Sequence, residues 1–206
     1  MERTGTGVRV LPYGDRALLV EADDPGAVHR ALLADPLPGQ RELVPAARTV
    51  LVLLDRPPTE RDAALLRELC TDVSVAEAEV GEVVLPVVFD GPDLAEVAAL
   101  TGRSPAALVA ALTAAELTVA FGGFAPGFGY LTGLPGELHV PRRATPRTRV
   151  PAGAVALAGP YAGVYPRASP GGWQLVGRTA AVLFDVDRDP PALLVPGTRV
   201  RFREGG

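Results

Sequence analysis

Glycine and proline crowd one stretch of the chain, and this restricts its fold more than any other feature. Residues 122–177 contain twelve Gly and eight Pro in 56 positions. Proline cannot continue a helix, and glycine marks tight turns and bulges, so long helices are excluded from this stretch. The apolar segments between these residues are short and closely spaced, which is typical of an all-β barrel or sandwich.

The part of the chain before this stretch has a different pattern, in which strand-like and helix-like segments alternate, as in a small α/β unit. We expect a boundary between the two parts near residues 80–90. Strands are expected at 8–12, 17–21, 48–54, 82–89, 117–121, 154–158, 173–178, 181–185 and 199–203. Helices are expected at 25–33, 60–70, 92–100 and 104–115, because Asp, Thr or Ser stands at or just before several of their starts.

Composition excludes several classes of protein. All 20 basic residues are Arg, so lysine Schiff-base chemistry, a biotinylated lysine and a P-loop lysine are absent. One cysteine and two histidines exclude an internal disulfide and argue against a bound metal. A net charge of −4 argues against nucleic acid as a partner. Without an 18-residue apolar run or a signal-peptide pattern, we expect a cytoplasmic protein that does not bind membranes.

Charge is unevenly distributed. Residues 117–184 contain six Arg and one acidic residue, Glu137, so this segment carries +5 and the rest of the chain −9. A positive patch on an acidic protein favours a small anionic ligand. Alternatively, these arginines pair with acids elsewhere in the chain.

Three segments carry the residues best suited to binding. In 122–135, glycines alternate with aromatic residues, so exposed backbone amides and an apolar wall could form an anion pocket; the alternative is a structural loop. In 141–151, three prolines stiffen a loop that carries arginines able to bind carboxylate or phosphate. The third, 165–173, ends in two glycines and the only Trp. The candidate binding residues are Gly123, Phe124, Pro126, Gly127, Phe128, Tyr130, Arg142, Arg147, Tyr165, Gly171, Gly172 and Trp173.

Two residues are candidates for catalysis. His139 lies between the first two segments and is the best candidate for proton transfer, although a structural histidine fits equally well. Arg143 is the candidate for stabilising an anionic intermediate. Asp90 and Asp93 are interpreted as helix caps.

Taken together and in this order, these segments resemble the KipI and allophanate hydrolase subunit 1 family, which includes the B-type subunit of the bacterial ATP-dependent 5-oxoprolinase. The matching strings include GFAPGFGYL from Gly123, PRRATPR from Pro141 and SPGGWQL from Ser169. The resemblance implies an α+β protein. A small α/β, ferredoxin-like domain would occupy residues 1–84, and a cyclophilin-like β-barrel of carboxyltransferase type would occupy residues 85–206.

The resemblance also implies a function and partners. It implies the B-type subunit of a heteromeric ATP-dependent 5-oxoprolinase, which cleaves 5-oxo-L-proline to L-glutamate with ATP hydrolysis. The partners would be a homologous barrel protein of the C or KipA type and an A-type component of the LamB/YcsF kind. ATP would be shared with these partners, and no metal or prosthetic group would be bound. The alternatives are a KipI-like inhibitor of a sensor histidine kinase and a carboxyltransferase component of the allophanate hydrolase or urea carboxylase type. The family usually has a His where this chain has Leu112.

Overall fold

The computed structural model describes residues 8–71 and 81–205. By their internal contacts, the residues divide into two compact units, 1–79 and 80–206. The two-domain assignment with a boundary after residue 84 stays a prediction. The strand Glu82–Val87 includes that position, and it pairs only with strands of the second unit.

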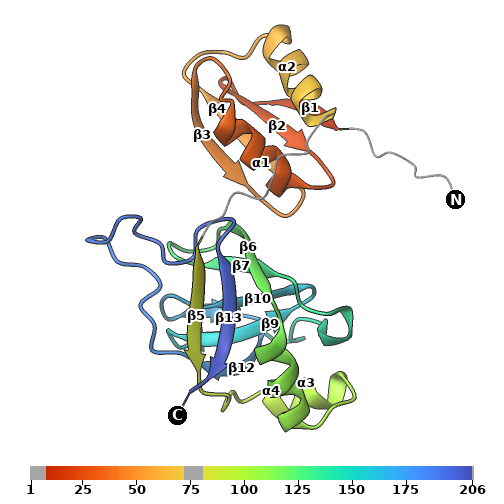
Figure 1. Cartoon of the computed structure of the whole chain (residues 1–206), viewed down its shortest axis with the longest axis vertical. Coiled ribbons are helices and arrows are strands. Elements are labelled where there is room, and N and C mark those ends of the chain that lie inside the picture. Colours follow the sequence, from red (N-terminus) through yellow and green to blue (C-terminus); the bar gives the residue numbers. More distant parts are fainter. Residues whose placement is uncertain (1–7, 72–80, 206) are drawn as a thin grey trace, which may run out of the picture. The chain divides into compact units, whose positions relative to one another are not determined.

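The first unit is an antiparallel four-stranded sheet with two helices (Figure 1). Its elements are β1 (Arg9–Tyr13), β2 (Ala17–Glu21), α1 (Pro25–Ala34), β3 (Gln40–Pro45), β4 (Thr49–Leu54) and α2 (Glu60–Thr71). The sheet order is β1-β2-β4-β3, and the helices touch each other. This is the arrangement of a ferredoxin-like βαββαβ unit in which the last strand has moved to the front of the chain.

Local signals explain the helices of this unit. The Asp24 carboxylate accepts the Ala27 N–H at 2.9 Å and Pro25 follows it, so α1 begins with a capped first turn. Thr59 and Asp62 form the reciprocal bonds of a capping box at the start of α2. β3 was not predicted, because its residues show little alternation of apolar and polar side chains.

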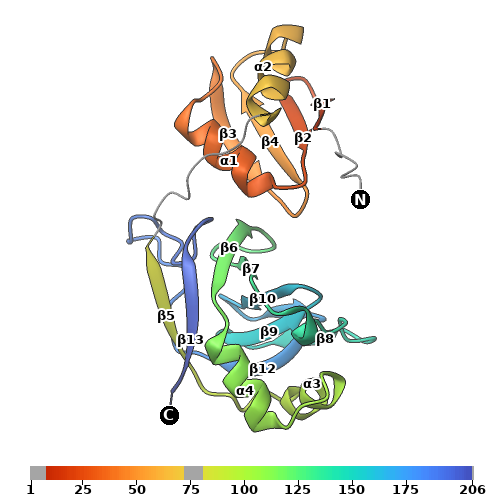
Figure 2. The same cartoon turned by 45° about the vertical axis from the view of Figure 1, so that its right-hand side comes forward.

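The second unit contains a seven-stranded sheet that nearly closes into a barrel (Figures 1 and 2). Its strands are β5 (Glu82–Val87), β6 (Leu117–Gly122), β7 (Gly129–Thr132), β9 (Ala154–Ala158), β10 (Tyr161–Val164), β12 (Gln174–Arg178) and β13 (Arg199–Glu204). The order is β12-β9-β10-β7-β6-β13-β5, and only β5 and β13 run parallel. The edge strands are linked by a bridge between Val88 and Arg178, which brings the two ends of the sheet together.

Shorter elements surround this sheet. They are α3 (Leu94–Leu100), α4 (Pro105–Ala114), the 3₁₀ turn η1 (Gly136–Leu138) and a two-stranded sheet of β8 (Arg147–Val150) and β11 (Ser169–Gly171). α4 packs against β13, and α3 packs against β12. Ser104 caps α4 by accepting the Ala107 N–H at 3.2 Å.

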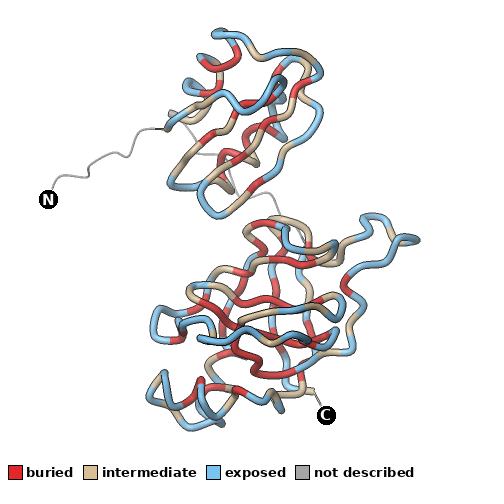
Figure 3. Tube along the Cα trace, turned by 180° about the vertical axis from the view of Figure 1, so that it is seen from behind, coloured by how far each residue is buried: buried red, intermediate tan, exposed pale blue. Residues whose placement is uncertain are grey.

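Strand β9 separates two layers of packing. All five of its residues are buried, and their sizes alternate. Val155 and Leu157 belong to the large aliphatic core of the barrel, whereas Ala154, Ala156 and Ala158 belong to a second cluster that includes Phe128 and Trp173. Since neighbouring residues of a strand point to opposite faces, the small alanines leave room on the second face for aromatic rings. Figure 3 shows the buried residues of this unit concentrated along its strands.

The strand expected at 181–185 is wrong. A single bridge joins Phe184 to Ala192 there, and the turn between them is held by Arg188, which donates to the carbonyls of Val182 and Pro191. Val182 is 61% exposed, so no further strand covers this segment. Apolar composition alone therefore did not provide a pairing partner.

Candidate functional site

Seven of the eleven aromatic residues form one cluster on the β9 alanine face of the barrel. Their neighbouring ring centroids lie 4.4–6.0 Å apart, mostly edge to face. The members are Phe121, Phe124, Phe128, Tyr130, Tyr161, Tyr165 and Trp173. The glycine-aromatic segment and the Trp segment thus meet, although they are far apart in the chain.

Phe124 stands out within this cluster. Its φ of 65° is the only positive value outside glycine in the described residues, and its side chain is 59% exposed. The ring lies edge-on to Phe128 and Tyr165 at 5.3 and 6.0 Å. An aromatic residue held in the left-handed region and left in solvent is costly, and such residues are frequent at ligand sites.

Glycines allow the rings to come together. A Cβ on Gly163 would lie 2.9 Å from Phe128 Cζ and 3.1 Å from Trp173 Cζ3. A Cβ on Gly171 would collide with the Tyr165 hydroxyl. Glycine is therefore required at both positions by close packing against an aromatic ring.

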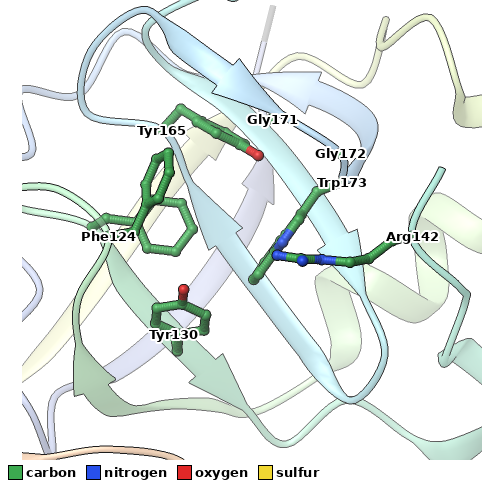
Figure 4. Close-up of a pocket in the computed structure, with 8 residues that line it drawn as sticks. Phe124, Tyr130, Arg142, Tyr165, Gly171, Gly172 and Trp173 are labelled. Atoms are coloured by element: carbon green, nitrogen blue, oxygen red, sulfur yellow. The ribbon is translucent and has the colours of Figure 1, made fainter. Parts of the chain in front are cut away.

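A small pocket opens beside the cluster, with a cavity volume of about 40 Å³. Figure 4 shows the Arg142 side chain extending toward Trp173, with the Tyr130 and Tyr165 rings on the other side of the pocket. The lining residues are Phe124, Phe128, Tyr130, Arg142, Tyr165, Gly171, Gly172 and Trp173. All eight were predicted as binding residues, and Arg142 is the only charged one.

The Tyr165 hydroxyl is suited to donating a hydrogen bond in this pocket. Burial raises the pKa of Tyr165, although the Trp173 backbone N–H and the nearby charge of Arg142 oppose this change. The hydroxyl consequently keeps its proton at neutral pH and remains available as a donor.

The other two arginines of the segment are bound elsewhere. Arg143 Nη1 and Arg147 Nη2 both donate to Asp93 Oδ1, at 2.8 and 2.6 Å. Burial acts to raise the pKa of Asp93, but the hydrogen bonds from Arg147 and Leu175 and the two guanidinium charges outweigh it, so this pKa lies below its usual range. Neither Arg143 nor Arg147 lines the pocket.

The remaining predicted residues also lie outside the lining. His139 follows η1, and its Nε2 lies 3.1 Å from the Leu134 carbonyl oxygen. Gly123, Pro126 and Gly127 shape the loop that carries Phe124; Gly127 has a φ of 81° and faces Phe184. Leu112, at the position where a His is usual, is fully buried in the aliphatic core.

The sequence interpretation missed the role of Asp93. It occupies the N-cap position of α3 as expected, but its side chain makes no cap hydrogen bond. The available signal was the excess of arginine in 117–184, which requires carboxylates from another part of the chain. Asp90 answers the same excess at the surface, where it pairs with Arg178 at 2.9 Å.

Comparison with known proteins identifies the family. Residues 8–194 match the family described as "Carboxyltransferase domain, subdomain C and D". The chain belongs to this family.

Named relatives of this carboxyltransferase-domain protein agree with one another. The B-type subunit of 5-oxoprolinase from Escherichia coli O157:H7 is 45% identical over 171 residues, which cover 81% of this chain and 78% of the relative. The protein of the same name from Bacillus subtilis (strain 168) is 34% identical, with 98% of this chain and 91% of the relative covered. The predicted family, which includes these components of 5-oxoprolinase, is thereby confirmed.

Solved structures share the fold. TTHA0988 has a TM-score of 0.77 and 36% identity, with 93% of this chain and 40% of the TTHA0988 chain covered. Kluyveromyces lactis urea carboxylase has a TM-score of 0.72 at 21% identity, which shows a shared fold only. The carboxyltransferase-domain chain therefore spans less than half of the TTHA0988 chain and 22% of the urea carboxylase chain.

Residues 8–71 and 81–205 also bear on metals and membranes. They contain no group of three or more His, Cys, Asp or Glu placed to hold a metal ion. No helix in them is by itself long and apolar enough to cross a membrane, although the bent pair α3 and α4 together reaches that length and composition.

Proposed function

We propose that this chain is the B-type subunit of a cytoplasmic, heteromeric, ATP-dependent 5-oxoprolinase, and that its pocket binds the carboxylate end of 5-oxo-L-proline. The relatives that carry the name of this 5-oxoprolinase component support the first part. The observation that carries the second is a pocket with aromatic walls and a single guanidinium, Arg142. The kinase-inhibitor and carboxyl-transfer alternatives are not better supported.

The chemistry of the pocket fits the proposed substrate. 5-Oxo-L-proline is a flat lactam ring with one carboxylate. Arg142 supplies a forked, permanently charged donor for that carboxylate. The faces of Phe124 and Trp173 offer apolar surface to the ring, and the Tyr165 hydroxyl offers a neutral donor.

The reaction needs more than this pocket. Ring opening adds water to the lactam carbonyl carbon, breaks the C–N bond and leaves a carboxylate and an amine. Developing negative charge on the carbonyl oxygen must be met by fixed donors in a water-poor site. A cavity of about 40 Å³ with one cation does not match a nucleoside triphosphate. We therefore assign ATP to surfaces shared with partner proteins, which would be a homologous barrel of the C or KipA type and an A-type component of the LamB/YcsF kind.

Reconstitution tests this proposal. The chain is purified with its partner proteins, and glutamate release and ATP hydrolysis are measured against 5-oxoproline concentration. We expect Arg142→Ala to raise KM about tenfold or more, since a hydrogen bond to a charged group contributes about 1.5–3 kcal/mol. Arg149→Ala is the matched control, because Arg149 is also exposed but does not line the pocket. Unchanged KM in Arg142→Ala would reject the pocket, and full activity without this chain would reject its place in the enzyme.

A further inference from the structure

Asp93 connects three parts of the second unit that are distant in sequence. Its side chain is almost fully buried. Oδ1 accepts from Arg143 and Arg147, and Oδ2 accepts the Leu175 backbone N–H at 2.7 Å. The Asp93 N–H in turn donates to the Leu175 carbonyl at 3.0 Å. One carboxylate therefore joins the start of α3, the arginine segment and strand β12.

The residues on both sides of Arg142 are attached to the strand that carries Trp173. The Arg143 backbone N–H donates to the Gly172 carbonyl at 2.8 Å. The Gln174 side-chain amide donates to the Pro141 carbonyl at 3.4 Å. Arg142 itself makes no hydrogen bond or ion pair within the described ranges, so its guanidinium remains available to the pocket.

Charge makes this attachment depend on Asp93. Two guanidiniums meet one carboxylate, and Arg143 Nε and Arg147 Nη1 are already buried without a hydrogen-bond partner. If the carboxylate were neutral, two like charges would face each other with no counter-ion. An uncompensated buried charge is strongly unfavourable, so the arginine segment would have to move away from β12.

We propose that Asp93 is the positioning residue of the pocket: by binding Arg143 and Arg147, it holds Arg142 beside Trp173. Of three neighbouring arginines, two fasten the segment and one is left for the ligand. The identity of the ligand rests on the proposed function, whereas the positioning rests on the contacts alone.

The first test needs no ligand. Trp173 is the only Trp, so the ¹⁵N-labelled full chain gives a single indole N–H resonance from the pocket wall. We expect Asp93→Asn to shift this resonance and to broaden or split it. Asp90→Asn, which makes the same charge change three positions earlier in an exposed ion pair, leaves it unchanged. An unaltered indole resonance in folded Asp93→Asn overturns the proposal.

The second test asks whether Asp93 acts through Arg142. In the assembled complex, Asp93→Asn is expected to raise KM for 5-oxoproline about tenfold with kcat largely kept, because contacting residues couple by this order of magnitude. In the Arg142→Ala background, Asp93→Asn is expected to cause no further rise. Equal losses in both backgrounds overturn the proposal, because they indicate a general structural effect.

Folding failure and failure of the proposed function are separable from this result. If Asp93→Asn does not fold, Arg147→Gln replaces it, since this variant keeps the carboxylate and removes one of its two cationic partners. Arg147→Gln is expected to change the indole resonance and KM in the same direction. If the complex has no 5-oxoprolinase activity, the proposed function fails, and the indole resonance still decides the positioning role.

Discussion

At the scale of single residues, the site depends on glycines that have no room for a side chain. Gly163 lies against the rings of Phe128 and Trp173, and the pocket wall is built on this contact. By contrast, nothing lies within 4 Å of a Cβ placed on Gly136, in the 3₁₀ turn. The same substitution at these two positions therefore separates ring packing from the general effect of replacing glycine.

We expect Gly163→Ala to lower the free energy of unfolding by about 1–3 kcal/mol, because the rings must move to admit the methyl group. Gly136→Ala is expected to be neutral or slightly stabilising, since it restricts the unfolded chain without a clash. Urea unfolding followed by Trp173 emission measures both. Equal stability of the two variants would show that the aromatic cluster adapts freely.

At the scale of elements, short-range signals predicted the helices well and the shortest strands poorly. Asp24 and Ser104 cap α1 and α4 at the predicted positions. The strands β7, β8, β10 and β11 have only three or four residues and owe their existence to partners across the sheet. All eight lining residues of the pocket came from the predicted segments. The division of labour among the arginines did not, because it depends on Asp93, about fifty positions upstream.

The Asp93 cluster predicts an acid-sensitive second unit. Because the pKa of Asp93 is lowered in the folded chain, its stabilisation is present above the unfolded value of about 3.9 and is lost as the pH falls through the folded value. Unfolding followed by Trp173 emission is expected to show a free energy that falls as the pH drops below about 4. Asp93→Asn should flatten this dependence, while Asp90→Asn should keep it. A wild-type slope in Asp93→Asn would contradict the ion cluster.

At the scale of the whole molecule, each unit has its own buried core. One aliphatic cluster lies wholly within the first unit, and two clusters lie within the second. We expect residues 81–206, expressed alone, to fold and to unfold cooperatively in urea, because their core is complete without the first unit. Trp173 reports this transition directly. A fragment without a cooperative transition would show that the two-domain prediction is wrong.

The parallel pairing of β5 with β13 has a consequence for the growing polypeptide. Residue 82 pairs with residue 199, so the strand that opens the second unit must wait for a partner made more than a hundred residues later. Domains fold in the order in which the ribosome releases them, and the strands of the first unit are complete by residue 54. Until β13 emerges, β5 exposes an unpaired edge, which is the kind of surface that nascent-chain chaperones protect. The barrel therefore closes only after β13 has left the ribosome.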